Sequence, residues 1–235
     1  MKNLIIGGII VFAVGVLAPQ ILQAQGTIYL SNLGQPSAGS LAVGSDSWLA
    51  AGIYTGNNAD GYSLNSIQLA MTDASGDPSG FTVMVYANGN DFGFSPGSTL
   101  GTLNGSTNPA TAGIYTYTPA ANLTLLPRTA YYIVLTAGTA VANGAYGWSY
   151  GGYAGVNTYN QIGGWVSLGD AYGPGTVDTS TDGLSWGENL DGFNPQYAID
   201  ATPVPEPSVL ALLVGGAAAF FDRRRHKQAE KLSLI

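Results

Sequence analysis

The stretch Tyr131-Tyr-Ile-Val-Leu-Thr-Ala137 decides the fold, because its residues alternate between two faces. Tyr131, Ile133 and Leu135 alternate with Tyr132, Val134 and Thr136. Successive side chains of a β-strand point to opposite faces, and β-branched and aromatic residues fit a pleated, half-buried surface. The stretch therefore predicts a strand and indicates an all-β domain.

The same two-residue period recurs on both sides of this stretch. Apolar residues alternate in three further runs, at Ile67, Leu69 and Met71, at Phe81, Val83 and Val85, and at Tyr197, Ile199 and Ala201. Turn-forming pairs such as Asp60-Gly61 and Asn143-Gly144 separate the runs, since glycine and asparagine tolerate the positive φ of tight turns. The predicted strands are 27–32, 47–54, 62–71, 81–87, 113–118, 131–137, 145–150, 163–168 and 196–201. Short strands separated by such turns predict an antiparallel β-sandwich, jelly-roll-like, over residues 26–203.

Length and charge limit what this domain can do. The chain has 235 residues and no cysteine, so residues 26–203 suit one domain without disulfides or thiolate chemistry. Arg128 is the only cation of this segment, which also contains eleven carboxylates, so its net charge is −10. Phosphate binding needs lysine and arginine, so no nucleic acid is expected as a partner. Binding of this domain to an anionic lipid surface is not expected either, for the same reason.

The first 25 residues read as an export signal. Lys2 precedes an uncharged run from Leu4 to Ala18, Pro19 ends it, and Ala24 supplies a small residue for cleavage. A charged start, an apolar run and a small residue are typical of a secretory signal peptide. The alternative is a transmembrane anchor that is retained, which the length of the run also permits.

The last 32 residues read as a sorting and anchoring segment. Pro203, Pro205 and Pro207 favour an extended backbone, and residues 208–221 that follow carry no charge. A basic cluster beside an apolar span stays on the cytoplasmic side, which places the upstream domain outside. That cluster is Arg223, Arg224, Arg225, His226 and Lys227. The alternative is a buried core helix, against which both the prolines and the arginines argue.

This three-part order resembles the carboxyl-terminal signal of PEP-CTERM proteins, which are exported by bacteria that make exopolysaccharide. The resemblance implies a sorting motif at Val204, Pro205, Glu206 and Pro207, a transmembrane helix over 208–221 and stop-transfer residues at Arg223, Arg224, Arg225 and Lys227. It also implies an exosortase-type processing enzyme as partner and a membrane as the place of sorting. One departure is that the chain continues past the basic cluster, from Gln228 to Ile235.

The middle of the chain also resembles exported β-sandwich modules known as choice-of-anchor domains. The matching segments include Tyr62-Ser-Leu-Asn-Ser-Ile-Gln-Leu69, Phe81-Thr-Val-Met-Val-Tyr86, Leu125-Leu-Pro-Arg-Thr-Ala-Tyr-Tyr-Ile-Val134 and Gln196-Tyr-Ala-Ile199. In that family the inferred role is surface display or adhesion. The resemblance implies no catalytic residue.

Few residues of the domain suit catalysis or metal binding. The only histidine is His226, so no Ser-His or Cys-His pair and no histidine metal ligand is expected in the domain. A carboxylate pair could hydrolyse glycosides, with Glu188 and Asp191 or Asp182 as candidates; the alternative is acidic turn residues. The stretch Asp73-Ala-Ser-Gly-Asp-Pro-Ser79 spaces oxygens as calcium loops do, but ordinary Asx turns also explain it. No cofactor is predicted, apart from this calcium alternative.

Aromatic residues crowd a glycine-rich stretch after Asn143. Trp148, Tyr150, Tyr153 and Trp165 could stack on sugar rings of an exopolysaccharide if one sheet face exposed them. The alternative is that they pack in the core and across strands. Arg128, as the only cation, is expected to pair with an aspartate.

The sequence therefore predicts a non-enzymatic exported protein of the cell surface or extracellular matrix, anchored by its carboxyl-terminal segment. A carbohydrate-binding module is the first alternative, and an acid glycosidase is the second.

Overall fold

A computed structural model describes residues 26–89, 94–151, 159–168 and 176–205. The predicted signal segment 1–25 and residues 206–235 of the predicted sorting segment lie outside the described residues. The described parts are built from β-strands and one short 3-10 helix, η1 (Val141–Asn143). None of their helices has the length and apolar character needed to cross a bilayer.

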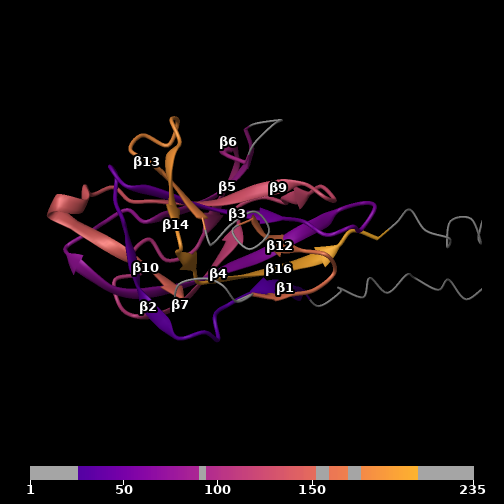
Figure 1. Cartoon of the computed structure of the whole chain (residues 1–235), viewed down its shortest axis with the longest axis horizontal. Coiled ribbons are helices and arrows are strands. Elements are labelled where there is room, and N and C mark those ends of the chain that lie inside the picture. The colour runs from indigo at the N-terminus through magenta and orange to yellow at the C-terminus, as the bar shows by residue number, and fades with distance from the viewer. Residues whose placement is uncertain (1–25, 90–93, 152–158, 169–175, 206–235) are drawn as a thin grey trace, which may run out of the picture.

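The strands run along the whole of the described chain (Figure 1). Their bounds are β1 Thr27–Ser31, β2 Ser37–Val43, β3 Trp48–Tyr54, β4 Tyr62–Gly76, β5 Thr82–Asn88, β6 Pro96–Asn104, β7 Gly113–Pro119, β8 Thr124–Leu125, β9 Ala130–Thr136, β10 Gly144–Gly151, β11 Asn160–Gln161, β12 Val166–Ser167, β13 Thr176–Ser180, β14 Gly187–Asp191, β15 Asn194–Pro195 and β16 Tyr197–Pro203.

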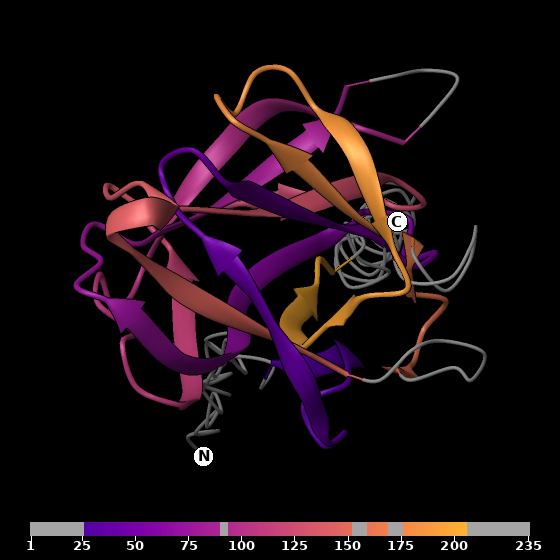
Figure 2. The same cartoon turned by 60° about the vertical axis from the view of Figure 1, so that its left-hand side comes forward.

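All pairings between these strands are antiparallel, which confirms the predicted all-β antiparallel class. The strand order is β11-β1-β16-β4-β7-β6-β5-β9-β3-β13-β14. The sheet curls until it nearly closes into a barrel (Figure 2). One section of it centres on β16, β4 and β10, and the other on β5, β9 and β3. Strand β7 joins the two sections, because it pairs with β4 through residues 113–117 and with β6 through residues 118–119.

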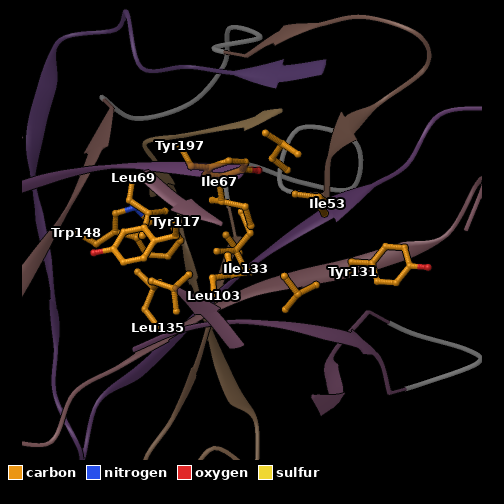
Figure 3. Packing of buried hydrophobic residues seen from close by; sticks show 14 of the residues in the cluster. Ile53, Ile67, Leu69, Leu103, Tyr117, Tyr131, Ile133, Leu135, Trp148 and Tyr197 are labelled. Carbon is orange, nitrogen blue, oxygen red and sulfur yellow. The ribbon is translucent and has the colours of Figure 1, made fainter. Parts of the chain in front are cut away.

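The main core lies between the two sections (Figure 3). Strand β4 contributes Ile67 and Leu69, and β9 contributes Ile133 and Leu135 from the opposite side. Strand β4 keeps its apolar residues inward over its whole length, because the register shifts between its pairs at Leu64 and Ser66. A bulge of this kind turns the side chains beyond it back to the same face. The predicted alternation of β4, β9 and β16 is thereby confirmed.

A second, smaller cluster lies on the outer face of β3, β9 and β5. It consists of Ala50, Met84, Tyr86, Ala130, Tyr132, Val134 and Leu168, with the partly buried Trp48, Tyr54 and Trp186 packed against it. Strand β9 is therefore buried on both faces, which explains why every one of its positions from Ala130 to Thr136 is buried. The two alternating sets of the opening stretch belong to two different clusters.

Eight of the nine predicted strands appear: seven differ by one or two residues at their ends, and β4 continues five residues further than predicted, to Gly76. The ninth, at 163–168, is wrong over most of its length, since only β12 at residues 166–167 forms. Gly163 and Gly164 have φ of 61° and 78°, a left-handed geometry that forms a turn here in place of an extended strand. The sequence did not predict β2, β6, β13 or β14, whose small and polar residues give weak alternation.

Candidate functional site

The first and last residues of the domain lie at the same end of the molecule. Thr27 at the start of β1 pairs with Ala201 of β16, and Pro203 at the end of β16 pairs with Tyr62. Strands β1 and β16 therefore lie side by side, and both lead to one end of the fold (Figure 1). We call this the tail end and define it by Gly26, Val204 and the loops 55–61, 125–129 and 162–164.

Asn58 and Gly61 hold the chain just after its last strand. The backbone N–H of Val204 donates to the carbonyl of Gly61 at 3.0 Å, and Nδ2 of Asn58 donates to the carbonyl of Val204 at 3.1 Å. Nδ2 of Asn58 also donates to the carbonyl of Gly61, at 2.5 Å, and its backbone N–H donates to the hydroxyl of Tyr62. The folded domain therefore includes Val204.

The other two loops of the tail end contact the 55–61 loop. The hydroxyl of Thr55 donates to the carbonyl of Leu126 at 2.6 Å, and the N–H of Arg128 donates to the carbonyl of Gly56 at 2.9 Å. A Cβ on Gly56 would lie 2.0 Å from the carbonyl oxygen of Gly163, so only glycine allows the loops to meet there. The loops 55–61, 125–129 and 162–164 form one continuous surface around Val204.

An aromatic group supports the loops from below. Trp165 stacks on Tyr29 with ring centroids 5.3 Å apart, and Tyr62 meets both rings edge-on at 5.0 and 5.1 Å. All three residues are buried. They pack β1 and the start of β4 against the 162–165 turn beneath the tail end.

The two ends of the molecule differ in surface chemistry. The tail end exposes Leu126 and Ile162, at 59% and 48%, together with the charged Arg128. The far end, formed by loops 44–47, 77–80, 137–143 and 181–186, carries exposed carboxylates at Asp46, Asp77 and Asp182. Asp46 and Asp182 accept hydrogen bonds from backbone N–H groups of that end. The exposed side chains therefore differ between the two ends: Leu126, Ile162 and Arg128 at the tail end, and three carboxylates at the far end.

The predicted sorting motif begins at this tail end. Val204 and Pro205 are its described residues, and Val204 is the one held by Asn58 and Gly61. Glu206, Pro207 and the predicted stop-transfer residues Arg223, Arg224, Arg225 and Lys227 lie outside the described residues.

Two of the predicted sugar-stacking residues are in the core, which corrects that prediction. Trp148 is fully buried in the main core and donates from Nε1 to the carbonyl of Gln196 at 3.1 Å. Trp165 is 1% exposed and belongs to the aromatic group under the tail end. Tyr150 is half-buried and meets Phe193 edge-on, while Tyr153 lies outside the described residues. The side chain of Trp148 points from β10 into the main core, so β10 does not present it on an open face.

Comparison of the chain with protein-family models, with curated proteins and with solved structures finds no match.

The carboxylates of the candidate glycosidase pair are only partly described. Asp182 accepts hydrogen bonds from the N–H groups of Ser185 and Leu184, both at 2.8 Å, and from the hydroxyl of Ser180. These bonds hold the pKa of Asp182 below its ordinary value, which is the opposite of what a general acid needs. The side chains of Glu188 and Asp191 are outside the description. Asp182 is therefore a turn-capping residue.

Asp178 is the carboxylate with the most unusual surroundings. It pairs with Ala50 across β13 and β3, which places it on the outer face beside the second cluster. Burial raises the pKa of Asp178 to about 6, so its proton binds more tightly than usual. Burial and the nearby charge of Asp178 both raise the pKa of Tyr132, whose buried hydroxyl has no hydrogen-bond partner. This pair could not be predicted from the sequence, because nothing local distinguishes Asp178 from the other aspartates.

The candidate calcium stretch is a strand in its first half. Asp73 and Gly76 belong to β4, and Oδ1 of Asp73 accepts from the N–H of Ala112 at 2.8 Å. Within the described ranges, no group of three or more His, Cys, Asp or Glu side chains could hold a metal ion.

Arg128 differs from its prediction as well. It makes no ion pair with an aspartate among the described residues, and it lies exposed in the turn before β9. The sequence predicted a turn at Asp60-Gly61 but missed that Asn58, two residues earlier, would hold Val204. That contact joins residues 146 positions apart, so only the fold could reveal it.

Proposed function

We propose that this chain is a non-enzymatic, exported protein of the cell surface or extracellular matrix. Its middle domain, a jelly-roll-like β-sandwich, is displayed outside the cytoplasm, and residues 204–235 sort it and anchor it to the membrane. An exosortase-type enzyme that processes this carboxyl-terminal segment is the partner that the proposal implies.

The meeting of both chain ends at one end of the domain supports this proposal most. The last strand, β16, delivers the chain to Val204 at the surface, and only Pro205, Glu206 and Pro207 stand between it and the uncharged run that begins at Ser208. A proline-rich segment leaving a folded domain remains extended and open to a processing enzyme. The amino-terminal segment enters at the same end, so export and anchoring act on one face.

The sandwich assignment has its own support. The two sections of the sheet pack their apolar faces against each other around one core, with β7 crossing between them. This is the packing that two sheets of a sandwich adopt.

Membrane fractionation of a truncated chain tests the proposal. The full chain, expressed in a bacterial host with an exosortase-type enzyme absent, should sediment with the membranes, and a chain ending at Pro203 should be released. Protease added to intact spheroplasts should digest the domain while a cytoplasmic control protein survives. Membrane association that persists after truncation, or a domain that protease cannot reach, would overturn the proposal.

The carbohydrate-binding alternative has lost its main residues, since Trp148 and Trp165 are buried. A hollow between β6 and the 119–123 segment, lined by Leu100, Thr102 and Asn122, has a volume of about 100 Å³. That is smaller than the roughly 300–1,000 Å³ of ordinary ligand sites, so it does not replace them.

A further inference from the structure

We infer that the tail end of the domain is a membrane-contacting face, on which Leu126, Ile162 and Arg128 meet the lipid headgroups. This inference rests on the proposed function, because it takes the anchored chain as its starting point. It adds which face of the domain meets the membrane and which residues make the contact.

The short connection to the apolar run keeps this face close to the bilayer. Val204 is held by Asn58 and Gly61, and in the sequence only Pro205, Glu206 and Pro207 separate it from the uncharged run that begins at Ser208. Three residues span at most about 10 Å. A domain of this size cannot turn its far end toward the bilayer on so short a connection. If the amino-terminal segment also entered the membrane, it would bring the same face to it, since β1 starts beside the end of β16.

The surface chemistry of the tail end suits lipid headgroups. Leu126 and Ile162 are exposed large apolar side chains on two neighbouring loops, and Arg128 is the only cation between residues 26 and 203. Apolar side chains with an adjacent cation bind the boundary between headgroups and acyl chains, where the cation meets lipid phosphate.

The distribution of exposed carboxylates favours the same face toward the membrane. Asp60 lies in the 55–61 loop of the tail end, and Asp200 lies on β16 beside Gly26; both are half-buried. Oδ2 of Asp60 is buried, and Oδ1 of Asp200 accepts a hydrogen bond from Nδ2 of Asn65 at 2.9 Å. Asp46, Asp77 and Asp182 at the far end are exposed. Repulsion from anionic lipids therefore acts mainly on the far end, which favours the same orientation as the connection does.

Single-cysteine labelling of the full chain tests the inference. The chain has no cysteine, so Leu126→Cys, Ile162→Cys and Leu184→Cys each carry one environment-sensitive fluorophore. Leu184 is the matched control, because it is 86% exposed and lies in the 181–186 loop of the far end. The labelled proteins are reconstituted into vesicles of phosphatidylcholine and phosphatidylglycerol that carry a nitroxide on the headgroup. Probes at positions 126 and 162 should lose about half of their emission and shift to shorter wavelength, and the probe at 184 should change little.

Each outcome decides a separate claim. Failure of the full chain to float with the vesicles contradicts the proposed anchoring, whereas flotation with equal quenching at 126, 162 and 184 contradicts only the membrane-contacting face. The probe at 126 could instead shift to shorter wavelength without losing emission to the nitroxide, and the shift could disappear on dilution. That result would show contact with a second copy of the chain and overturn the inference. Arg128→Gln should reduce quenching at 126 in vesicles with phosphatidylglycerol, and an unchanged signal would remove Arg128 from the contact.

Discussion

Trp148 shows how burial decides the role of a single residue. Its ring is fully buried between the two sections of the sheet, its centroid lies 6.4 Å from that of Tyr197, and its Nε1 donates to the carbonyl of Gln196. A buried tryptophan contributes through apolar burial, and its indole N–H needs a partner inside the protein. Its role is therefore to stabilise the fold, and a sugar could not reach it.

Substitution of Trp148 tests this role. Trp148→Ala should lower the free energy of unfolding by about 3–5 kcal/mol, because it removes the ring and leaves a cavity. Urea denaturation followed by circular dichroism measures the loss. Trp48→Ala is the matched control: Trp48 is only partly buried, so its loss should be clearly smaller. Equal losses for both would contradict the assignment of Trp148 to the core.

Arg128 carries backbone strain at the tail end. Its φ of 48° lies in the left-handed region, and it is the only residue other than glycine with positive φ in the described ranges. Arg128→Gly should raise the free energy of unfolding by about 0.5–1 kcal/mol, since relief of the strain exceeds the added flexibility of glycine. Thermal unfolding of Arg128→Gly beside Arg128→Ala measures this, because alanine removes the charge but keeps the strain. Equal stability of the two variants would show that no strain is stored there.

The aromatic residues also show the limit of sequence reasoning about the site. A glycine-rich stretch with tyrosine and tryptophan looks the same whether its rings face solvent or the core. The position of Trp148 depends on the pairing of β10 with β2, and β2 (Ser37–Val43) has too little alternation to be predicted. The role of Asn58 was hidden for a related reason, since its partner Val204 is distant in sequence.

At the scale of elements, the strands with the clearest alternation were predicted best. Strands β4, β9 and β16 contain runs with apolar residues at every second position, such as Ile67, Leu69 and Met71 of β4, and each appears where expected. Strands β6 (Pro96–Asn104) and β13 (Thr176–Ser180) are rich in small and polar residues, so they gain their strand geometry from pairing with β5 and β3. Pairing partners are tertiary information that the local pattern does not contain.

Strand β13 makes the stability of the domain depend on pH. Its Asp178 has a pKa of about 6 in the folded state, above the ordinary value of 3.8 that applies to the unfolded chain. The folded state therefore binds the proton more tightly, so the free energy of unfolding should fall as pH rises from about 4 to about 7. Asp178→Asn should remove this fall and raise stability at pH 7 by about 1–2 kcal/mol, allowing for the part of the carboxyl that water reaches.

Urea denaturation at a series of pH values measures this dependence. Asp182→Asn is the control of opposite sign: hydrogen bonds lower the pKa of Asp182, so its contribution is present above its ordinary pKa and is lost as pH falls. Asp182→Asn should therefore lower stability at pH 7 and have little effect at the lowest pH. A stability curve for Asp178→Asn that still falls between pH 4 and 7 would contradict the role of Asp178.

At the scale of the whole molecule, the position of the chain ends gives the domain its orientation. The strands β1 and β16 bring both ends to the tail end, which exposes Leu126, Ile162 and Arg128, and the exposed carboxylates of Asp46, Asp77 and Asp182 lie at the opposite end. The polarity of the surface and the exit of the chain are separate features of the sequence, and they favour the same face toward a membrane. A change that separates them should therefore separate anchoring from lipid contact.

A circular permutant makes that separation. Because Thr27 and Ala201 are paired neighbours, a short Gly/Ser linker can join residue 203 to residue 27 without crossing the fold. New ends placed in the exposed 181–186 loop would then carry the proposed anchoring segment 204–235 at the far end, with loss of the hydrogen bonds that Asp182 makes there. The permutant should fold with a circular dichroism spectrum like that of the natural order and still float with vesicles. Its probe at position 126 should lose the quenching by headgroup nitroxide, because the tail end now points away from the lipid.

Persistent quenching at 126 would mean that the tail end binds lipid without help from the anchor, and loss of flotation would mean that segment 204–235 does not anchor by itself.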